Sequence, residues 1–328
     1  MNNPINDLFI PRYPALNNRI NENETFGVEI EAIISPDEDD NYRERNELAT
    51  FIRETTGVEI YDEGWNTETR SYWKVIYDGS VEGRGEDAEV ISPPLKGEEG
   101  MHEVNMVVNP MEAFGMEVNS STGLHVHHDA KELLSSELAM MVQFYSFYEG
   151  IIDTFQPLSR RGRNACYCQP VKSFYCEDSA KGVFDIINER LKKVSSGVEK
   201  IGDTYNTGIK YENMNTLFRR EYGGERYCKL NLNSFYKHGT VEFRHHSGTV
   251  DAEKVLNWIE LTQHIVNYVR RKKSRITGRH TPSFKKMMEL LDVRPEIHEF
   301  YDKRRKHFRS RYGKMDAQCT NYKNGYKN

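Results

Sequence analysis

The sequence has little cysteine and no long apolar run. Its five cysteines among 328 residues are odd in number and form no CxxC pair, which disfavours a disulfide framework and a standard zinc site. No segment approaches the roughly 18 consecutive apolar residues of a membrane span, and the first residues lack a basic stretch followed by an apolar one. We therefore expect a cytoplasmic chain without a membrane segment or a signal peptide.

The chain does contain aromatic bulk and many charges. Its 15 Phe, 19 Tyr and 3 Trp supply a core, which excludes disorder along the whole length. From Arg270 onward there are 18 Lys and Arg against 6 Asp and Glu, whereas residues 1–269 hold 27 basic and 44 acidic side chains. An acidic body suits cation binding, and a basic tail suits an anion or a cover over the body.

Predicted strands come in antiparallel pairs with helices between them, which indicates an α+β fold. Residues 25–34 alternate apolar and acidic side chains, the pattern of a half-buried strand whose core face carries Val28, Ile30 and Ala32. Further strands are expected at 73–77, 88–91, 124–128, 227–233 and 240–245, the last two paired around Lys237-His238-Gly239. Helices are expected at 41–56, 98–114, 135–155, 181–194, 252–271, 283–291 and 295–309.

A length of 328 residues exceeds the roughly 250–300 at which single cores stop growing. We therefore expect one large domain and a smaller appendage. The expected parts are a surface leader at 1–24, a catalytic domain at 25–270 and a basic helical C-terminal appendage at 271–328.

Carboxylates gather on one face of the first predicted strand and around the turn that follows the second. Glu29 and Glu31 lie two residues apart, so both side chains leave the same face. Two adjacent like charges are costly unless water or a cation screens them, so the pair is a solvated strip or a divalent-ion site. Glu82 and Glu89 bracket a glycine-rich turn as surface residues or further ligands, and Asp78 is expected to form that turn.

Histidines and a Glu–Arg pair add to this set. His125 and His127 share one face of Gly-Leu-His-Val-His, as a chance cluster or as contacts to a metal or phosphate. Glu242 and Arg244 share a face of Thr-Val-Glu-Phe-Arg, as a salt bridge or as a metal carboxylate beside a phosphate-binding guanidinium. Carboxylates with one His favour Mg²⁺ or Mn²⁺ over Zn²⁺, and Mg²⁺ often shares its shell with substrate phosphates. This indicates nucleotide chemistry, although neither GxxxxGKS nor GxxxxGKT occurs.

A basic loop near residue 160 has two interpretations. It is a solvated surface after a helix, or it holds a substrate carboxylate or acyl phosphate in a pocket also lined by Tyr167 and Cys168. The candidate substrate-binding residues are Arg160, Arg161, Arg163 and Asn164.

Ordered motifs span residues 25–269. They are Phe-Gly-Val-Glu-Ile-Glu, the segment from Asp-Gly-Ser to Glu-Val-Ile-Ser-Pro-Pro, Gly-Leu-His-Val-His, Arg-Tyr with Leu-Asn, and Thr-Val-Glu-Phe-Arg with Ser-Gly-Thr. In this order they resemble the amidoligase family, a group of carboxylate–amine ligases related to glutamine synthetase and glutamate–cysteine ligase. The basic tail lies outside the resemblance.

The resemblance implies a curved antiparallel sheet of the glutamine-synthetase-like type around ATP and Mg²⁺. The implied activity forms an amide or peptide bond through an acyl phosphate, on an amino acid or peptide, with Glu31, Glu242 and Arg244 as catalytic residues. Asp78 is the alternative candidate for the metal-ligand role that the resemblance gives to Glu82. The implied metal ligands are Glu29, Glu31, Glu82, Glu89, His125 and Glu242. The implied nucleotide contacts are His127, Arg226, Asn231 and Arg244.

Two other functions stay open at the level of sequence. The segment His125–Asp129 superficially resembles the HxH motifs of zinc hydrolases, although Glu29, Glu31 and Glu242 are unusual company for zinc. The basic tail could contact DNA or RNA phosphates. The ligase interpretation implies small-molecule or peptide carboxylates and amines as partners, without nucleic acid or membrane.

Overall fold

A computed structural model describes residues 20–37, 39–162, 164, 166–171, 224–271 and 281–312. The chain divides into two compact units. Unit 1 comprises Met1–His128 and His246–Glu260, and unit 2 comprises Asp129–His245 and Leu261–Asn328. The three parts expected from the sequence stay a prediction, and the helix expected at 181–194 lies outside the described residues.

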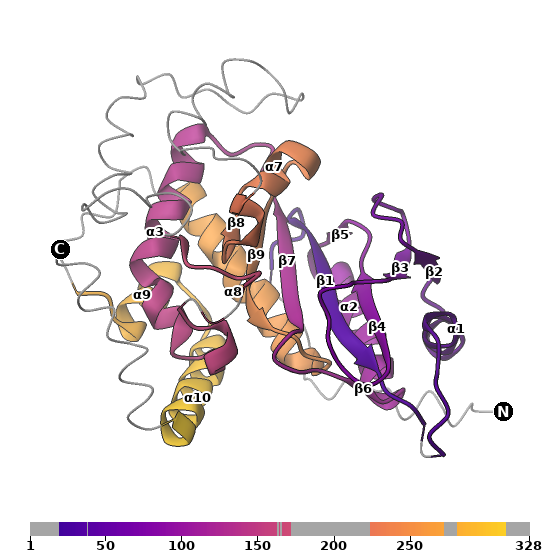
Figure 1. Cartoon of the computed structure of the whole chain (residues 1–328). Coiled ribbons are helices and arrows are strands. Elements are labelled where there is room, and N and C mark those ends of the chain that lie inside the picture. The colour runs from indigo at the N-terminus through magenta and orange to yellow at the C-terminus, as the bar shows by residue number, and fades with distance from the viewer. Residues whose placement is uncertain are drawn as a thin grey trace. The chain divides into compact units, whose positions relative to one another are not determined.

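Unit 1 contains a mostly antiparallel sheet with the strand order β2-β3-β4-β1-β7 (Figure 1). The short strands β5 and β6 pair with opposite ends of β1, and only the β2–β3 pair is parallel among the pairings described in this unit. The strand bounds are β1 Thr25–Ile34, β2 Ile60–Gly64, β3 Trp73–Ile76, β4 Glu86–Ile91, β5 Leu95–Lys96, β6 Met116–Glu117 and β7 Gly123–Asp129.

Alternation along β1 separates the core from the charged face. The side chains of Val28, Ile30 and Ala32 are buried, as the sequence predicted, while Glu29 and Glu31 leave the opposite face. Ser92-Pro93-Pro94 ends β4 because proline has no amide to donate to a strand ladder. The fold is therefore α+β, with carboxylates on one face of the central strand of unit 1.

Two helices pack on the sheet of unit 1. Helix α1 (Arg45–Thr56) contacts β2, β3 and helix α2 (Gly97–Ala113), which itself contacts β5 and β6. Helix α1 begins four residues later than predicted, because Glu44 and Glu47 form a capping box at that point. It ends at Gly57, whose φ of 76° is readily adopted by glycine.

Unit 2 is mainly helical in its described part. Strands β8 (Leu230–Asn231) and β9 (Thr240–Ser247) pair antiparallel, as expected. The predicted strand 227–233 was too long, because Tyr227 belongs to a 3₁₀ helix and the short helix α7 (Asn233–His238) begins at Asn233 and connects the two strands. The 3₁₀ helices η1 (Leu158–Arg160) and η2 (Gly224–Tyr227) precede β8. The longer helices are α3 Ser135–Asp153, α8 Ala252–Arg271, α9 Phe284–Leu291 and α10 Pro295–Tyr312, and α8 begins within unit 1.

The basic tail packs on the end of α3. The ring of Phe155 contacts the rings of Phe284 in α9 and Tyr301 in α10. Arg304 Nε donates to the carbonyl of Phe155 at 3.3 Å, and Arg305 Nε donates to Thr154 Oγ1 at 3.1 Å. Cations at a helix C-terminus are favourable because the last carbonyls carry partial negative charge. Part of the positive charge of the tail is thus engaged with α3.

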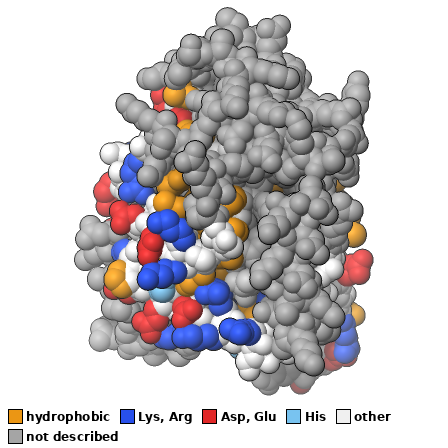
Figure 2. Space-filling view, turned by 90° about the vertical axis from the view of Figure 1, so that its left-hand side faces the viewer, with side chains coloured by type: hydrophobic (Ala, Val, Ile, Leu, Met, Phe, Trp, Pro, Cys, Tyr) orange, Lys and Arg blue, Asp and Glu red, His pale blue; other side chains and the backbone are white. Residues whose placement is uncertain are grey.

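The outer face of α10 carries both signs of charge. Lys303 pairs with Glu299, and Lys306 pairs with Asp302. Figure 2 shows basic and acidic side chains lying side by side on the described part of this face of the molecule. Among the helices in the described ranges, none has both the length and the apolar character needed to cross a membrane.

Candidate functional site

Three neighbouring strands of unit 1 bring carboxylates and a histidine together. Glu31 of β1 lies directly opposite Glu89 of β4, and Glu29 lies directly opposite His125 of β7. Opposed residues in an antiparallel pair point to the same face. Glu31, Glu89 and His125 each offer a ligand atom, and these atoms all lie within 4.8 Å of one another. The strand register therefore assembles a group that the sequence could place only on separate strands.

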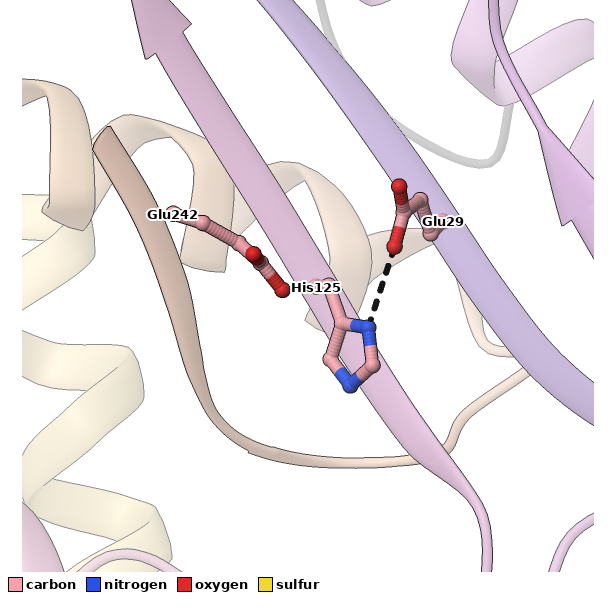
Figure 3. A group of neighbouring side chains, drawn as sticks. All are labelled: Glu29, His125 and Glu242. Carbon is pink, nitrogen blue, oxygen red and sulfur yellow. Dashed lines mark hydrogen bonds and ion pairs between the residues drawn. The ribbon is translucent and has the colours of Figure 1, made fainter. Parts of the chain in front are cut away.

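Glu29 and Glu31 flank the ring of His125. His125 Nδ1 lies 3.2 Å from Glu29 Oε2, the pair drawn in Figure 3, and His125 Nε2 lies 3.3 Å from Glu31 Oε1. His127 Nε2 lies 3.2 Å from the other oxygen of Glu29. The predicted residues Glu29, Glu31, Glu89, His125 and His127 thus form one cluster, which we call the β1 cluster.

The surroundings of Glu29 in the β1 cluster favour its ionised form. Burial acts to raise the pKa of Glu29, but the charge of His127 and the hydrogen bonds of both histidines hold that pKa well below its usual range. The backbone amide of Gly123 donates to Glu31 Oε2 at 2.6 Å, which fixes the position of this carboxyl group. Glu31 and His125 are also buried.

The donor set of the β1 cluster fits a divalent cation. Several carboxylates face one another across the strands, and imidazole nitrogens lie beside them. Oxygen donors with a single imidazole suit Mg²⁺ or Mn²⁺. Glu31, Glu89 and His125 would hold such an ion, and Glu29 is next to them.

Glu82 does not join either group of possible metal ligands found in the described ranges. Its side chain is exposed, and its backbone bonds with the side chains of Ser121 and Asn119. Asp78 Oδ1 accepts a hydrogen bond from the amide of Ser80 at 2.9 Å, so Asp78 shapes the turn as the sequence predicted. Metal ligation by Glu82 stays a prediction.

Unit 2 contains the predicted pair Glu242 and Arg244 on one side of β9. Arg244 Nη1 forms an ion pair with Glu242 Oε1, and Asn231 Nδ2 of β8 donates to Glu242 Oε2 at 2.5 Å. Glu242 is also drawn in Figure 3. Arg244 Nε donates to the carbonyl of Tyr167 at 3.4 Å. Two residues predicted to bind the nucleotide, Asn231 and Arg244, therefore both contact the predicted metal ligand Glu242 within this unit.

The other basic residues predicted for a nucleotide or substrate lie in different surroundings. Arg226 is exposed, with its guanidinium 4.7 Å from the centre of the Tyr227 ring. Arg160 is buried, and Arg161 is fully buried with its Nε bonded to the carbonyl of Gln156 at 2.8 Å. Asn164 donates to the carbonyl of Leu158. Arg163 lies outside the described residues.

Sequence reasoning missed a buried network on the other side of β9. Tyr145 bonds to His245 Nδ1 at 2.8 Å, and His245 Nε2 bonds to Asp153 Oδ1 at 2.6 Å. Lys229 Nζ lies 2.7 Å from the same Asp153 oxygen and 3.1 Å from Glu149 Oε1. The only signal in the sequence was that His245 shares the core face of β9 with Val241 and Phe243. Its partners come from α3, about ninety residues away along the chain.

Carboxylates and histidines thus converge on one face of the sheet of unit 1. Residues 22–266, well over half of the chain, match the model of the family described as "Putative amidoligase enzyme". The chain belongs to this amidoligase family, as its motifs indicated, and is a ligase by family.

Comparison with individual proteins adds little to the family assignment. A comparison with curated proteins gave no match. Among solved structures, the chain is similar to a bifunctional glutathione synthetase from Pasteurella multocida, at 12% sequence identity and a TM-score of 0.36. The likeness covers 96% of this chain and 50% of that one, so this chain spans half the length of that protein. A similarity of this size is too small to define a shared fold.

Proposed function

We propose that this protein is an ATP- and Mg²⁺-dependent carboxylate–amine ligase that forms an amide or peptide bond through an acyl phosphate. The substrates are an amino acid or peptide carboxylate and an amine. The proposal includes a glutamine-synthetase-like curvature of the sheet and Mn²⁺ as an alternative metal. The observation that carries it is the convergence of Glu31, Glu89 and His125 from three neighbouring strands, in a member of the amidoligase family.

The residues of the β1 cluster take defined parts in this proposal. A cation would be held by Glu31, Glu89 and His125, and Glu29 would add a further negative charge beside it. When bound, Mg²⁺ supplies positive charge that lowers the repulsion between ATP and an attacking carboxylate. We assign Glu242 to the same ligand set from its sequence motif. The bond from Gly123 to Glu31 fixes one carboxylate oxygen and leaves the other directed at the ring of His125.

Arg244 is the proposed phosphate-binding residue. Its guanidinium is held by the carboxylate of Glu242 and by the carbonyl of Tyr167, so its position is set before a nucleotide arrives. A preorganised cation stabilises developing charge without reorganising in the transition state. The planar, charged guanidinium suits the oxygens of a transferring phosphoryl group.

The proposed reaction has two steps. A substrate carboxylate oxygen attacks the γ-phosphorus of ATP, the bond to the β,γ-bridging oxygen breaks, and ADP leaves with that electron pair. The amine nitrogen of the second substrate then attacks the carbonyl carbon of the acyl phosphate. Collapse of the tetrahedral intermediate expels inorganic phosphate, and the nitrogen loses a proton to leave the amide.

The test is an incubation of the full chain with ATP and Mg²⁺ against pools of amino acids and peptides. Phosphate release should accompany a product whose mass equals the two substrates minus water. Glu31→Gln should abolish turnover and leave the melting temperature close to that of the parent, whereas Glu54→Gln, on the exposed side of α1, should change neither. If Glu31→Gln consumes ATP at the parent rate with the identified substrate, the proposal is wrong.

Neither alternative function gains support from the described residues. A zinc site built on His125–Asp129 would use His128, but His128 is buried and faces away from His125 and His127 because strand side chains alternate. In α10, Lys303 and Lys306 pair with acids of the same helix, and Arg304 and Arg305 contact the end of α3. The described part of α10 therefore carries charges of both signs, which suits a nucleic acid less well than a surface of positive charge alone.

A further inference from the structure

A continuous series of contacts in unit 2 leads from a carboxylate to a pair of tyrosines, of which Tyr167 is exposed and Tyr227 half-buried. Glu242 pairs with Arg244, and Arg244 Nε donates to the carbonyl of Tyr167. The backbone of Arg244 donates to the carbonyl of Lys229, and the amide of Lys229 donates to the carbonyl of Gln169, two residues after Tyr167. Backbone and side-chain bonds thus fix the segment that carries Tyr167 beside the proposed phosphate-binding arginine.

Tyr167 packs against a second ring and is still partly exposed. The centre of its ring lies 5.1 Å from the centre of the Tyr227 ring, with an angle of 62° between the two planes. Despite this support, 45% of the Tyr167 residue surface is exposed. On Tyr227, the guanidinium of Arg226 lies 4.7 Å from the ring centre. The patch therefore combines two aromatic rings with a cation, beside a second cation that is bound to a carboxylate.

This combination suits a ligand with an aromatic ring at one end and negative charge at the other. Aromatic side chains stack on nucleobases of any sequence, because every base has a π face. Arginine beside the stacking rings adds attraction for phosphate and for the base. A free amino acid or short peptide offers a flat ring together with a negative charge only if one of its side chains is aromatic.

We propose that Tyr167 and Tyr227 form the subsite for the nucleobase of ATP, with Arg226 beside it and Arg244 at the phosphate end. The assignment rests on the proposed ATP-dependent function and adds to it the residues that bind the base. Tyr167 is the ring that contacts the base, and Tyr227 supports Tyr167 from the side. Because stacking is insensitive to the base, the subsite should accept GTP with an affinity close to that for ATP.

The experiment distinguishes the contribution of the base to binding from that of the phosphates. The affinities of the full chain for ATP with Mg²⁺ and for inorganic tripolyphosphate with Mg²⁺ are measured by isothermal titration calorimetry. Tyr167→Ala should weaken ATP binding roughly ten- to hundred-fold, the usual range for loss of one stacked base, and should leave tripolyphosphate binding within about twofold. Tyr167→Phe keeps the ring and should bind both ligands like the parent protein.

Tyr42→Ala is the matched control, because Tyr42 is 69% exposed and belongs to unit 1. It should change neither affinity. Parent-like ATP binding by Tyr167→Ala, or an equal loss of ATP and tripolyphosphate, would overturn the base subsite while leaving the proposed function intact. A parent protein that binds neither ligand would overturn both. A melting temperature for each variant shows whether it is folded, and Tyr167→Leu replaces the alanine variant if that variant is not.

Discussion

Asp153 Oδ1 lies 2.6 Å from Nε2 of His245, and both side chains are fully buried in unit 2. The other ring nitrogen of His245 bonds to Tyr145, and the same oxygen of Asp153 contacts Lys229. His245 follows Arg244 directly in β9, so this network fixes the strand from the side opposite the proposed phosphate-binding residue. Burial lowers the pKa of His245 to about 4, the charge of Lys229 acts in the same direction, and the bond to Asp153 opposes both.

The depressed pKa of His245 predicts a loss of stability in mild acid. Between pH 6.5 and about 4 the unfolded chain binds a proton on this histidine and the folded chain does not, so stability is full above pH 6.5 and falls as pH falls toward 4. The expected loss from this group is about 3 kcal/mol of unfolding free energy. Urea unfolding at pH 7, 6, 5 and 4.5 measures it.

His245→Gln provides the control for this titration. The variant will be less stable at every pH, because it breaks a buried network, but the slope between pH 6.5 and 4.5 should be smaller than in the parent. Asp153 titrates lower: burial acts to raise its pKa, but Lys229 and His245 outweigh burial and bring it to about 2. Its stabilisation is therefore lost only as pH falls from the unfolded value of 3.8 toward 2. Equal slopes in parent and variant would contradict the role of His245.

Gly248 allows a close approach that shapes the β1 cluster. A Cβ atom at this position would lie 2.1 Å from Thr122 Oγ1 and 3.0 Å from the carbonyl oxygen of Glu31. The amide of Gly248 donates to the carbonyl of Thr122, and the next residue, Gly123, donates to the carboxylate of Glu31. Gly248→Ala should therefore cost roughly 1–3 kcal/mol of stability and weaken Mg²⁺ binding by displacing Gly123.

Gly27→Ala is the comparison for that variant. A Cβ atom at Gly27 meets its nearest neighbour, Ser92 Oγ, at 3.5 Å, an ordinary contact. Calorimetric titration with Mg²⁺ and thermal unfolding should show a clear loss for Gly248→Ala and little change for Gly27→Ala. Similar behaviour of the two variants would show that the approach of Gly248 to Thr122 is unimportant for the cluster.

Lys74 holds the segment between β2 and β3. Its side chain is buried, and its ammonium donates to the carbonyls of Asn66 at 2.6 Å and Glu68 at 2.7 Å. Burial lowers its pKa, while nearby carboxylates oppose that shift. Lys74→Met removes both donors, so we expect roughly 1–3 kcal/mol of destabilisation and faster amide exchange around residues 66–68.

Hydrogen–deuterium exchange followed by mass spectrometry measures the local effect at residues 66–68. Lys96→Met, an exposed lysine of β5, should leave both stability and exchange close to the parent values. Unchanged exchange at these residues in Lys74→Met would mean that the two carbonyls are held by other contacts.

The sequence predicted the parts of the fold that depend on local pattern. Alternation along β1 separated Glu29 and Glu31 from the core, and the apolar stripe of α8 gave its bounds, Ala252–Arg271. The strand β2 was missed because its five residues do not alternate and its partner is parallel. The helix α7 was missed because six residues are too few for a periodic signal.

Only part of the candidate site could be predicted from the sequence, because its assembly also depends on long-range contacts. Spacing showed that His125 and Glu31 each lie on the polar face of a strand, but the strand order that brings them together is a long-range property. The network around Asp153 depends on α3 packing against β9, which no spacing along the chain reveals. The burial of Arg161 against the rings of Phe308 and Tyr312 likewise follows from the tertiary position of α10.

The basic tail should stabilise unit 2 through its contacts with the end of α3. Arg304 donates to the carbonyl of Phe155 and Arg305 to the hydroxyl of Thr154, directly after the last residue of α3. Replacing both arginines by alanine should lower the unfolding free energy by about 1–3 kcal/mol, because each contact of this kind is worth from about 0.3 to 2 kcal/mol. Arg309→Ala, an exposed residue of the same helix, should have little effect. Urea unfolding at low and high salt measures this, since screening weakens contacts to the helix end. If the double variant matches Arg309→Ala at both salt concentrations, the charge of the tail does not act through α3.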